Sequence, residues 1–256
     1  MSEYFPLFDR VYVGTTTSQA WGEGKSSTAE YAALQATIGS AFMERYGGLA
    51  NVTYSWYLTS EGSVPGIGLN PHEQARWGAE GYLGLTMHAL HAVKPLEFLW
   101  SPSNGNVRPN ATGRVAEAAG LKALFCSLPY PVAVHFQDWL GQSVTFKFPF
   151  HYNYSSAFTC EDDTVPTMAM FADVQAACPH GLREVKVNAE LFAERLSPSG
   201  QRGEDNGANI INADPHEVAS RLACYEAHGF PVGCSWATPH WYSLMTYANA
   251  TVYHPY

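Results

Sequence analysis

The segment Val52-Thr-Tyr-Ser-Trp-Tyr-Leu58 and the helix start that follows it, Asn70-Pro-His-Glu73, decide the fold. The first is a short run rich in β-branched and aromatic residues, which predicts a β-strand. In the second, a capping Asn, a Pro at the first helical position and a Glu three residues after the Asn mark the start of a helix. We expect that helix to bury Leu83, Met87 and Leu90. A strand followed by an amphipathic helix is the unit from which parallel α/β sheets are built.

The same alternation of strand-like and helix-like patterns continues along the chain. The run at residues 10–17 precedes a helix expected over residues 28–46. One face of this helix comprises Tyr31, Leu34, Ile38 and Phe42. Further strands are expected at 96–100, at either 123–126 or 132–136, at 184–191 and at 231–236. Further helices are expected around 115–119, from Asp163 with Pro166 and carrying Met170, Phe171 and Val174, and from Asp214, continuing with Val218, Leu222 and Tyr225.

The composition describes one globular domain over residues 1–256 and excludes several classes of protein. The hydrophobic share is 46%, and Tyr 15, Phe 13 and Trp 7 supply an aromatic-rich core. The net charge is -9 and the basic residues are scattered, so a nucleic-acid partner is not expected. No run of about 18 apolar residues occurs, so a membrane span is not expected either.

The cysteines and glycosylation acceptor sites bear on the compartment. Four N-x-S/T sites are present, at Asn51, Asn110, Asn153 and Asn249. They favour a secretory or extracellular location and a glycoprotein, whereas the first residues lack the pattern of a signal peptide. The five cysteines form no C-x-x-C pair, and their odd number leaves at least one thiol free. Cys126 and Cys234 lie in apolar runs, and we expect both to be buried thiols.

Polar and aromatic residues directly after the expected strands are the candidates for a functional site, because the active site of a parallel α/β barrel lies at the carboxyl ends of its strands. The carboxylates are Glu61, Glu190 and Asp138. The other candidates are Gln137, Asn188, Ser101, Asn104, Trp21, Trp236, His240, Trp241 and Tyr242. Amides and hydroxyls can hydrogen-bond sugar hydroxyls, and aromatic rings can stack on sugar C–H faces. Glycosidic cleavage needs one carboxylic acid and one carboxylate. Glu61 and Glu190 are the expected pair, with no metal and no organic cofactor.

Four ordered segments strengthen this interpretation. They are Tyr54-Ser-Trp-Tyr-Leu-Thr-Ser-Glu61, Phe98-Leu-Trp-Ser-Pro-Ser103, His135-Phe-Gln-Asp138 with Gly141, and Val187-Asn-Ala-Glu-Leu-Phe192. They resemble the G-W-Y-L-P-x-E, I-S-P-Y-F, P-Q-D-G-x-G and A-N-x-E-x-F motifs of an uncharacterised bacterial family of glycoside-hydrolase-like TIM barrels. The resemblance covers most of the chain.

The resemblance implies a (β/α)8 barrel in which Glu61 follows the fourth strand and Glu190 belongs to the seventh. It further implies that Glu61 is the general acid/base and Glu190 the nucleophile of a retaining glycosidase. Asp138 and Gln137 would bind sugar hydroxyls or change the pKa values of the pair.

The chain departs from the family pattern in its motifs and at its beginning. Thr59 replaces a Pro, Trp139-Leu140 interrupts the Asp-Gly pair, and Ser103-Asn104 stands where aromatic residues are usual. The run at 11–14 with Trp21 resembles the third strand of the family, which leaves the first two strands without residues. Four explanations fit this pattern: a fragment, a permuted barrel, a subunit completed by another polypeptide, or a barrel whose first strands are misassigned.

Two functions therefore stay open. The pair Glu61 and Glu190 favours a glycosidase acting on an oligosaccharide or polysaccharide. The missing opening strands favour a non-catalytic, barrel-derived subunit that binds carbohydrate or supports an assembly. His88 and His91 lie at i, i+3 in an apolar helix without a nearby carboxylate, so we interpret them as structural residues and expect no metal site.

Overall fold

The computed structural model describes most of the chain, in two compact units. Described are residues 10–15, 27–49, 52–103, 110–138, 140, 159–190, 192–194, 210–212 and 215–236, with the backbone alone at 192–194, 210–212 and 234–236. The first unit comprises Met1–His135 and Ala169–Val185, and the second comprises Phe136–Met168 and Lys186–Tyr256.

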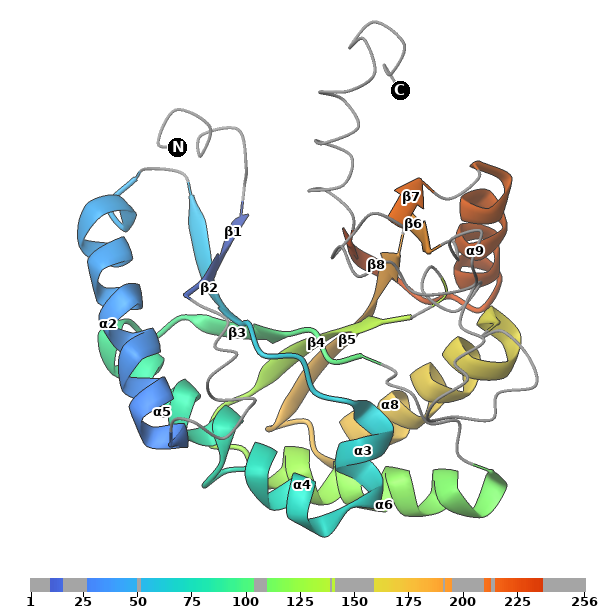
Figure 1. The fold of residues 1–256 in the computed structure, drawn as a ribbon, viewed down its shortest axis with the longest axis horizontal. Coiled ribbons are helices and arrows are strands. Elements are labelled where there is room, and N and C mark those ends of the chain that lie inside the picture. Colours follow the sequence, from blue (N-terminus) through green and yellow to red (C-terminus); the bar gives the residue numbers. More distant parts are fainter. Residues whose placement is uncertain are drawn as a thin grey trace, which may run out of the picture. The chain divides into compact units, whose positions relative to one another are not determined.

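Six strands form one sheet, and their order in the sheet follows the sequence (Figure 1). They are β1 (Arg10–Gly14), β2 (Thr53–Leu58), β3 (Glu97–Trp100), β4 (Val132–Gln137), β5 (Leu182–Glu190) and β8 (Val232–Trp236). The pairs β1–β2, β2–β3, β3–β4 and β5–β8 are parallel. At the start of β4 and β5, the Val132 N–H donates to the Gly181 carbonyl at 2.9 Å. The predicted parallel α/β sheet is confirmed, while closure into an eight-stranded barrel stays a prediction.

β4 settles the position that the sequence left open. All six of its residues are buried, as expected for a parallel strand covered on both faces. The competing segment at 123–126 belongs instead to helix α6 (Ala111–Ser127), which is longer than predicted and is capped by the Asn110 side chain on the Gly113 N–H. Short apolar runs in a buried helix and in a buried strand have the same composition, so hydrophobicity alone could not separate them.

Helix α2 (Thr28–Tyr46) has the predicted bounds but a different buried face. Its start is a capping box, in which the Glu30 N–H donates to the Ser27 hydroxyl and the Glu30 carboxylate accepts from the Ser27 N–H. The buried residues are Tyr31, Ala32, Gln35 and Gly39. The predicted face was wrong at Leu34, which is 47% exposed. Gly39 faces the partner elements instead, because a Cβ there would lie 3.1 Å from the Leu90 and Trp56 side chains.

The helix predicted from Asn70 is divided into shorter helices. The structure has α3 (Val64–Leu69), α4 (Pro71–Trp77) and α5 (Tyr82–Val93). The start at Pro71 is confirmed, since the Asn70 side chain accepts from the His72 N–H at 2.9 Å. The predicted burial of Leu83, Met87 and Leu90 is also confirmed. The segment between α4 and α5, with glycines at 78 and 81, ends the first helix before the apolar pattern does.

The crossing of α3 and α6 depends on two glycines. A Cβ placed on Gly120 would overlap the carbonyl oxygen of Gly68, and one on Gly68 would meet the backbone of Glu117. We expect Gly120→Ala to destabilise the protein by about 1–3 kcal/mol, because neither helix backbone can move without disturbing the other. Urea unfolding measures this loss, and Gly48→Ala, whose added Cβ would meet nothing within 4 Å, is the matched control. Equal stability of the two variants would contradict the close approach.

Glu117 is a buried carboxyl on α6 beside this crossing. It is 1% exposed, and neither carboxyl oxygen has a hydrogen-bond partner among the residues described. Burial raises the pKa of Glu117 to about 7, and the Arg114 guanidinium, 4.0 Å away, opposes the rise.

Because the folded-state pKa of Glu117 is the higher one, the folded state retains this proton to higher pH than the unfolded chain. The stability from Glu117 is fully present below the ordinary pKa of a Glu and is lost as the pH rises through about 7. We expect Glu117→Gln to remove this pH dependence and to gain up to about 3 kcal/mol at pH 8. Urea unfolding at pH 5 and pH 8 checks it, with the exposed Glu226→Gln as control. A wild-type protein with no loss between these pH values would contradict the prediction.

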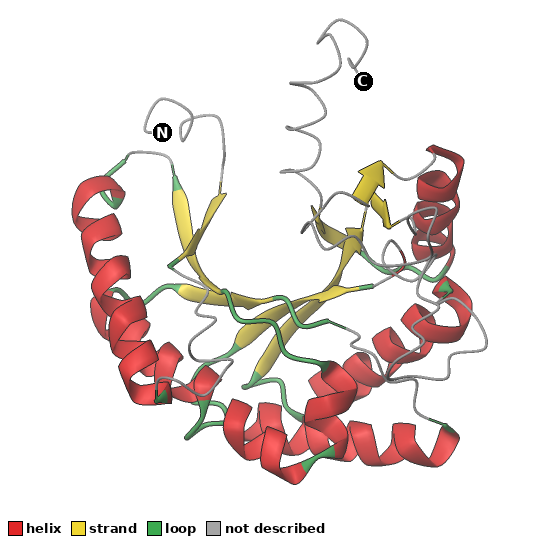
Figure 2. Cartoon of the chain, viewed as in Figure 1, coloured by secondary structure: helices red, strands yellow, loops and turns green. Residues whose placement is uncertain are grey.

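The remaining described elements are helices and a separate pair of short strands. The π-helix η2 (Cys160–Thr164) leads into α8 (Val165–Ala177), so the helix predicted from Asp163 is present, and its Met170, Phe171 and Val174 are buried. β6 (Phe192–Glu194) and β7 (Ile210–Asn212) form a separate antiparallel pair (Figure 2). Helix α9 is Pro215–Ala227.

Two disulfides correct the predicted state of the cysteines. Cys126 is joined to Cys178 and Cys160 to Cys224. The prediction of a buried thiol at Cys126 was therefore wrong, because an apolar surrounding does not distinguish a thiol from half of a disulfide. The side chain of Cys234 lies outside the described residues. In the same described segments, no helix combines the length and the apolar character needed to cross a membrane.

Candidate functional site

Glu190 ends β5 and lies beside the end of β4. Its side chain is fully buried, and so is that of Asn188, two residues earlier on the same face of the strand. The Asp138 N–H, directly after β4, donates to the Asn188 carbonyl at 3.4 Å, and the Glu190 N–H donates to Asp138 Oδ1 at 3.4 Å. Gln137, the last residue of β4, is 1% exposed. Four of the predicted site residues therefore meet at the carboxyl ends of two neighbouring strands.

Asp138 is held by groups of the protein itself. Its Oδ1 accepts from the Leu140 N–H at 3.1 Å, and its Oδ2 accepts a short hydrogen bond from the Tyr225 hydroxyl. Burial raises the pKa of Asp138 to about 6, while the hydrogen bonds and the Arg221 charge oppose the rise. Burial and the Asp138 carboxylate in turn raise the pKa of Tyr225. These contacts make Asp138 a brace between β4, β5 and α9, and binding of a sugar hydroxyl by Asp138 stays a prediction.

Arg221 fixes the other side of Glu190 and was not predicted from the sequence. Its Nη1 donates to the Glu190 carbonyl at 2.5 Å and its Nη2 to the Leu140 carbonyl at 3.5 Å. Arg221 is 8% exposed, whereas Leu222, which belongs to the apolar pattern of this helix, is 40% exposed. A hydrophobic pattern cannot reveal a buried arginine, because its burial depends on carbonyl acceptors supplied by distant segments.

Glu61 is exposed and lies three residues after β2, on a loop that is fixed on both sides. Before it, the Ser60 carbonyl accepts from Trp100 Nε1 at 2.9 Å and the Ser60 N–H donates to the Tyr82 hydroxyl at 3.1 Å. After it, Gly62 and Val64 exchange backbone hydrogen bonds with Ser103, each at 2.9 Å. The first unit thus presents Glu61 from an anchored loop at the carboxyl end of a parallel strand.

A buried polar chain supports this loop and could not be found from sequence spacing. The Thr15 hydroxyl donates to the Gln35 side-chain carbonyl at 2.6 Å, and the Gln35 amide donates to the Tyr82 hydroxyl at 3.4 Å. Ser101, predicted to contact substrate, is 2% exposed and donates to the His135 carbonyl at 2.6 Å. It ties β3 to β4, and a substrate contact by Ser101 stays a prediction.

Some of the remaining predicted residues lie outside the residues that the structure describes, and others make structural contacts. Trp236 pairs with Glu190 through the backbone of β8, and its side chain is not described. His91 stacks on Tyr130 with ring centroids 4.1 Å apart, and His88 Nδ1 lies 3.4 Å from the Tyr130 hydroxyl, as expected for structural histidines. Outside the described residues lie Trp21, Asn104, His240, Trp241 and Tyr242.

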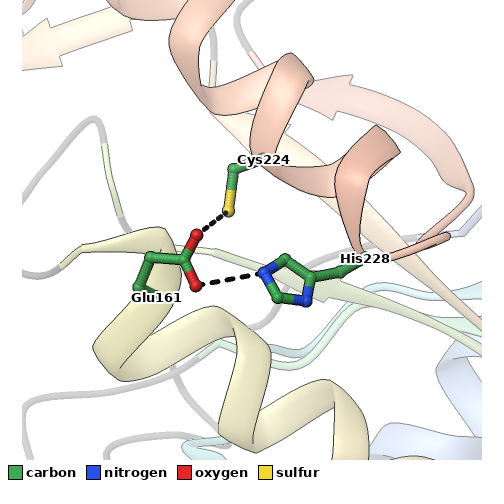
Figure 3. Close-up of side chains that lie close together, drawn as sticks. All are labelled: Glu161, Cys224 and His228. Carbon is green, nitrogen blue, oxygen red and sulfur yellow. Dashed lines mark hydrogen bonds and ion pairs between the residues drawn. The ribbon is translucent and has the colours of Figure 1, made fainter.

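A second constellation in the same unit as Glu190 was not predicted. A cavity of about 580 Å³ is bordered by η2 and α9, and its wall includes Cys160, Glu161, His216, Glu217, Arg221 and Cys224. Glu161 Oε2 lies 3.0 Å from His228 Nε2, and Glu161 Oε1 lies 3.6 Å from Cys224 Sγ (Figure 3). Because Cys224 is in a disulfide, its sulfur carries no proton and this last approach is a contact without a hydrogen bond.

Comparison with known proteins gives no family. No family model matches the chain, and no curated protein matches it. A solved structure of a candidate α-L-fucosidase from Bacteroides thetaiotaomicron VPI-5482 is similar to 85% of this chain, with 12% identity and a TM-score of 0.49. A psychrophilic endo-β-1,4-xylanase of glycoside hydrolase family 10 is similar to 82%, with 10% identity and a TM-score of 0.37. The chain spans 58% of the length of each. Both of these similar structures are glycoside hydrolases, and at these TM-scores they assign no activity to this chain.

Proposed function

We propose that the chain is a glycoside hydrolase of the retaining type, with Glu190 as nucleophile and Glu61 as general acid/base. The observation that carries the proposal is the placement of Glu190 and Asp138 together at the carboxyl ends of β4 and β5. In parallel α/β enzymes of the barrel type, catalytic residues come from this end of the strands. A nucleophilic carboxylate at such a position attacks the anomeric carbon, and water later hydrolyses the glycosyl-enzyme ester.

The groups around Glu190 suit a nucleophile that must not move. Its N–H is held by Asp138 and its carbonyl by Arg221, so the strand end is fixed on both sides. Fixed geometry is worth more to a reaction than proximity alone, because the reacting atoms must be aligned. Arg221 and Tyr225 act in this proposal as positioning residues, through the backbone of Glu190 and the carboxylate of Asp138.

The sheet order supports Glu61 as the second carboxylate. β3 and β4 stand between β2 and β5, which is the spacing of the fourth and seventh strands implied by the resemblance. Glu61 is exposed on an anchored loop, as an acid that protonates a leaving oxygen should be. Asp138 and Gln137 would then contact sugar hydroxyls or raise the pKa of the acid by their charge and dipole.

The experiment is incubation of the purified protein with a panel of oligosaccharides, polysaccharides and aryl glycosides, with release of reducing sugar as the measurement. For any substrate that is cleaved, proton NMR of the first product identifies the anomer. Retention of configuration supports the roles of Glu61 and Glu190. Inversion would show that neither residue is a nucleophile, because inverting enzymes use one general acid and one general base. No cleavage of any glycan, by a folded protein, would count against the glycosidase.

A second function is favoured by one observation on the sheet. In the part of the chain that the structure describes, β1 is paired with β2 alone. An edge strand of a parallel sheet is a template for pairing with another chain, so a non-catalytic carbohydrate-binding or structural subunit completed by a partner is the alternative. Mass measurement in solution and calorimetric binding of the same glycans distinguish the two. A monomer that cleaves glycans excludes the subunit, and an assembly that binds without cleavage excludes the enzyme.

A further inference from the structure

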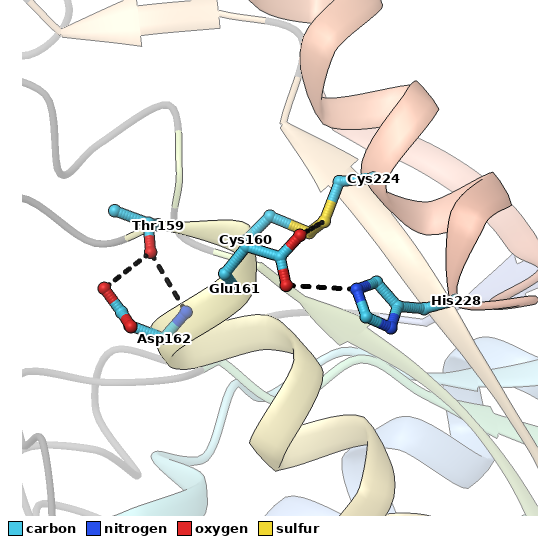
Figure 4. A network of polar contacts seen from close by, with 6 residues as sticks. All are labelled: Thr159, Cys160, Glu161, Asp162, Cys224 and His228. Carbon is cyan, nitrogen blue, oxygen red and sulfur yellow. Dashed lines mark hydrogen bonds and ion pairs between the residues drawn. A yellow bond between two sulfur atoms is a disulfide. The ribbon is translucent and has the colours of Figure 1, made fainter.

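Four side chains with metal-binding atoms converge between η2 and α9 (Figure 4). Cys160 and Glu161 are the first two residues of η2. Cys224 lies in the last turn of α9 and His228 directly follows the helix, and the His228 N–H donates to the Cys224 carbonyl at 3.1 Å, which places the two residues on the same side. Cys160 and Cys224 are joined as a disulfide, and Glu161 lies against both Cys224 and His228.

The distances are those of ligands around one ion. The ligand atoms of Glu161, Cys224 and His228 all lie within 4.8 Å of one another. A tetrahedral zinc ion with bonds of about 2.0–2.3 Å has ligand atoms about 3.3–3.8 Å apart. Glu161 approaches His228 at 3.0 Å and Cys224 at 3.6 Å, so two edges of such a tetrahedron are almost formed. The two sulfurs become the third and fourth corners of the tetrahedron once the bond between them is broken.

We propose that reduction of the Cys160–Cys224 disulfide creates a four-ligand zinc site made of Cys160, Glu161, Cys224 and His228. A dithiol reductant attacks one sulfur, forms a mixed disulfide and is released as its own cyclic disulfide, so two electrons pass to the protein and two cysteine thiols result. Zn²⁺ then displaces the two thiol protons into solvent and binds two thiolates, the Glu161 carboxylate and the neutral His228 imidazole. The site is independent of whether the chain cleaves glycosides.

Each of the two segments that carry the ligands has hydrogen bonds that do not depend on the disulfide. At the start of η2, the Thr159 hydroxyl accepts from the Asp162 N–H at 3.0 Å and the Thr159 N–H donates to the Asp163 carboxylate at 2.8 Å. Helix α9 is anchored through Arg221 and Tyr225 to the ends of β4 and β5. We therefore expect reduction to leave Cys160 and Glu161 opposite Cys224 and His228, so that an ion can bind without refolding of either segment.

A reductant can reach this disulfide more readily than the other one. Cys160 and Cys224 are half-buried and border the cavity of about 580 Å³. In the Cys126–Cys178 disulfide only one sulfur is comparably accessible, because Cys126 is half-buried and Cys178 is fully buried. Thiol–disulfide exchange requires in-line access of a thiolate to a sulfur, so Cys160–Cys224 is the disulfide that opens first.

The ligand types select the metal. Two thiolates, one imidazole and one carboxylate in tetrahedral geometry fit Zn²⁺, whereas Mg²⁺ and Ca²⁺ need oxygen ligands. Co²⁺ adopts the same geometry and is coloured, which makes it the probe. The charge of the ligands also suits a dication. Two thiolates and one carboxylate carry three negative charges, so the zinc complex has a net charge of about -1.

The test compares oxidised and reduced full-length protein, the latter treated with dithiothreitol and desalted under argon. We expect the reduced protein to bind one equivalent of Co²⁺ with visible tetrahedral absorption and a sulfur-to-cobalt charge-transfer band, and Zn²⁺ to displace it. Binding by the oxidised protein should be at least about 100-fold weaker, because both thiolates are absent. Equal binding by both forms, or no cobalt absorption in the reduced form, would overturn the proposal.

Variants on the same elements locate the ion. His228→Ala and Glu161→Gln should each weaken Co²⁺ binding by at least about tenfold, since loss of a ligand costs no less than loss of a group behind one. His216→Ala and Glu217→Gln, which border the same cavity on α9, should have no effect. His180 is the competing ligand, because its Nε2 lies 3.1 Å from the Cys126 carbonyl beside the other disulfide. Binding that is lost in His180→Ala and kept in His228→Ala would place the ion beside the Cys126–Cys178 disulfide and refute the proposal.

One further variant removes the dependence on reductant. Cys160→Ser frees the Cys224 thiol without any reducing agent and leaves Glu161, Cys224 and His228 as three ligands with one open position. We expect this variant to bind Co²⁺ under air, more weakly than the reduced wild type and more strongly than the oxidised wild type. Circular dichroism confirms that it is folded. A folded Cys160→Ser protein that binds no better than the oxidised wild type contradicts the site.

Discussion

Glu190→Gln should reduce the rate of glycan cleavage by at least about 100-fold and leave the fold unchanged. The amide has the size of the carboxylate but cannot attack an anomeric carbon, and single positioned acid, base or nucleophilic groups contribute about 10²–10⁴ in rate. The backbone contacts of Glu190 with Asp138 and Arg221 do not involve its side-chain oxygens, so the variant keeps these two contacts. The measurement is kcat on the best substrate of the glycan panel.

Glu61→Gln should behave differently from Glu190→Gln, and the difference assigns the roles. An acid is needed only when the leaving oxygen is basic, so Glu61→Gln should lose most activity on a natural glycan and much less on an aryl glycoside with an acidic phenol as leaving group. Glu190→Gln should lose activity on both substrates, because formation of the glycosyl-enzyme bond precedes every product.

Glu184→Gln is the matched control for both variants. It changes the same type of side chain six residues earlier on β5, away from the carboxyl end of the strand, and should keep full activity. If Glu190→Gln were as active as Glu184→Gln, Glu190 would have no part in the mechanism. If Glu61→Gln lost equal activity on both kinds of substrate, the assignment of Glu61 as acid would be wrong.

The sequence predicts the elements of this fold well wherever local chemistry decides them. The start of α2 is fixed by the neighbouring residues Ser27 and Glu30, and the start of α4 follows from Asn70 and Pro71. It fails where a distant packing partner decides. Leu34 and Leu222 fit the helical period of apolar residues but are exposed. On α2 the small residue Gly39 packs against the neighbouring elements, and on α9 Arg221 is buried because it donates to the Glu190 carbonyl.

The candidate site divides in the same way. Glu190, Asn188 and Asp138 could be found because each stands at the end of an apolar run, and parallel strands bring such ends together. Arg221 and Tyr225 could not, since they lie within a helix and act on strand ends 31 and 87 residues away in sequence. The cluster of Glu161, Cys224 and His228 was equally hidden, because its two halves are 63 residues apart and neither half forms a metal-binding motif alone.

Replacement of Cys126 and Cys178 by Ala should lower the free energy of unfolding by about 4 kcal/mol. The bond closes a loop with a sequence separation of 52, and in the chain-entropy model a loop of this length restricts the unfolded chain by about that amount. The bond also joins the last turn of α6 to the turn before β5. There Gly181 donates its N–H to the Cys178 carbonyl and accepts from Val132 through its own carbonyl, so the same turn starts the pairing of β4 with β5. Alanine is preferred to serine because Cys178 is fully buried and a hydroxyl there would add the cost of an unpaired polar group.

The comparison that isolates the effect of position is the double variant Cys160→Ala with Cys224→Ala. Its loop has a sequence separation of 64, so the chain-entropy model gives it nearly the same loss, about 4 kcal/mol. Any larger loss in the Cys126 and Cys178 variant therefore measures the packing at the α6 terminus, because the entropy of the two loops cancels in the comparison. Guanidinium unfolding without reductant gives both values, and alkylation with mass spectrometry before unfolding verifies which cysteines are bonded in the wild type. A Cys126 and Cys178 variant that loses less than about 1 kcal/mol, from a wild type in which both cysteines resist alkylation, would show that the covalent tie contributes little and that α6 and the turn before β5 are held by packing alone.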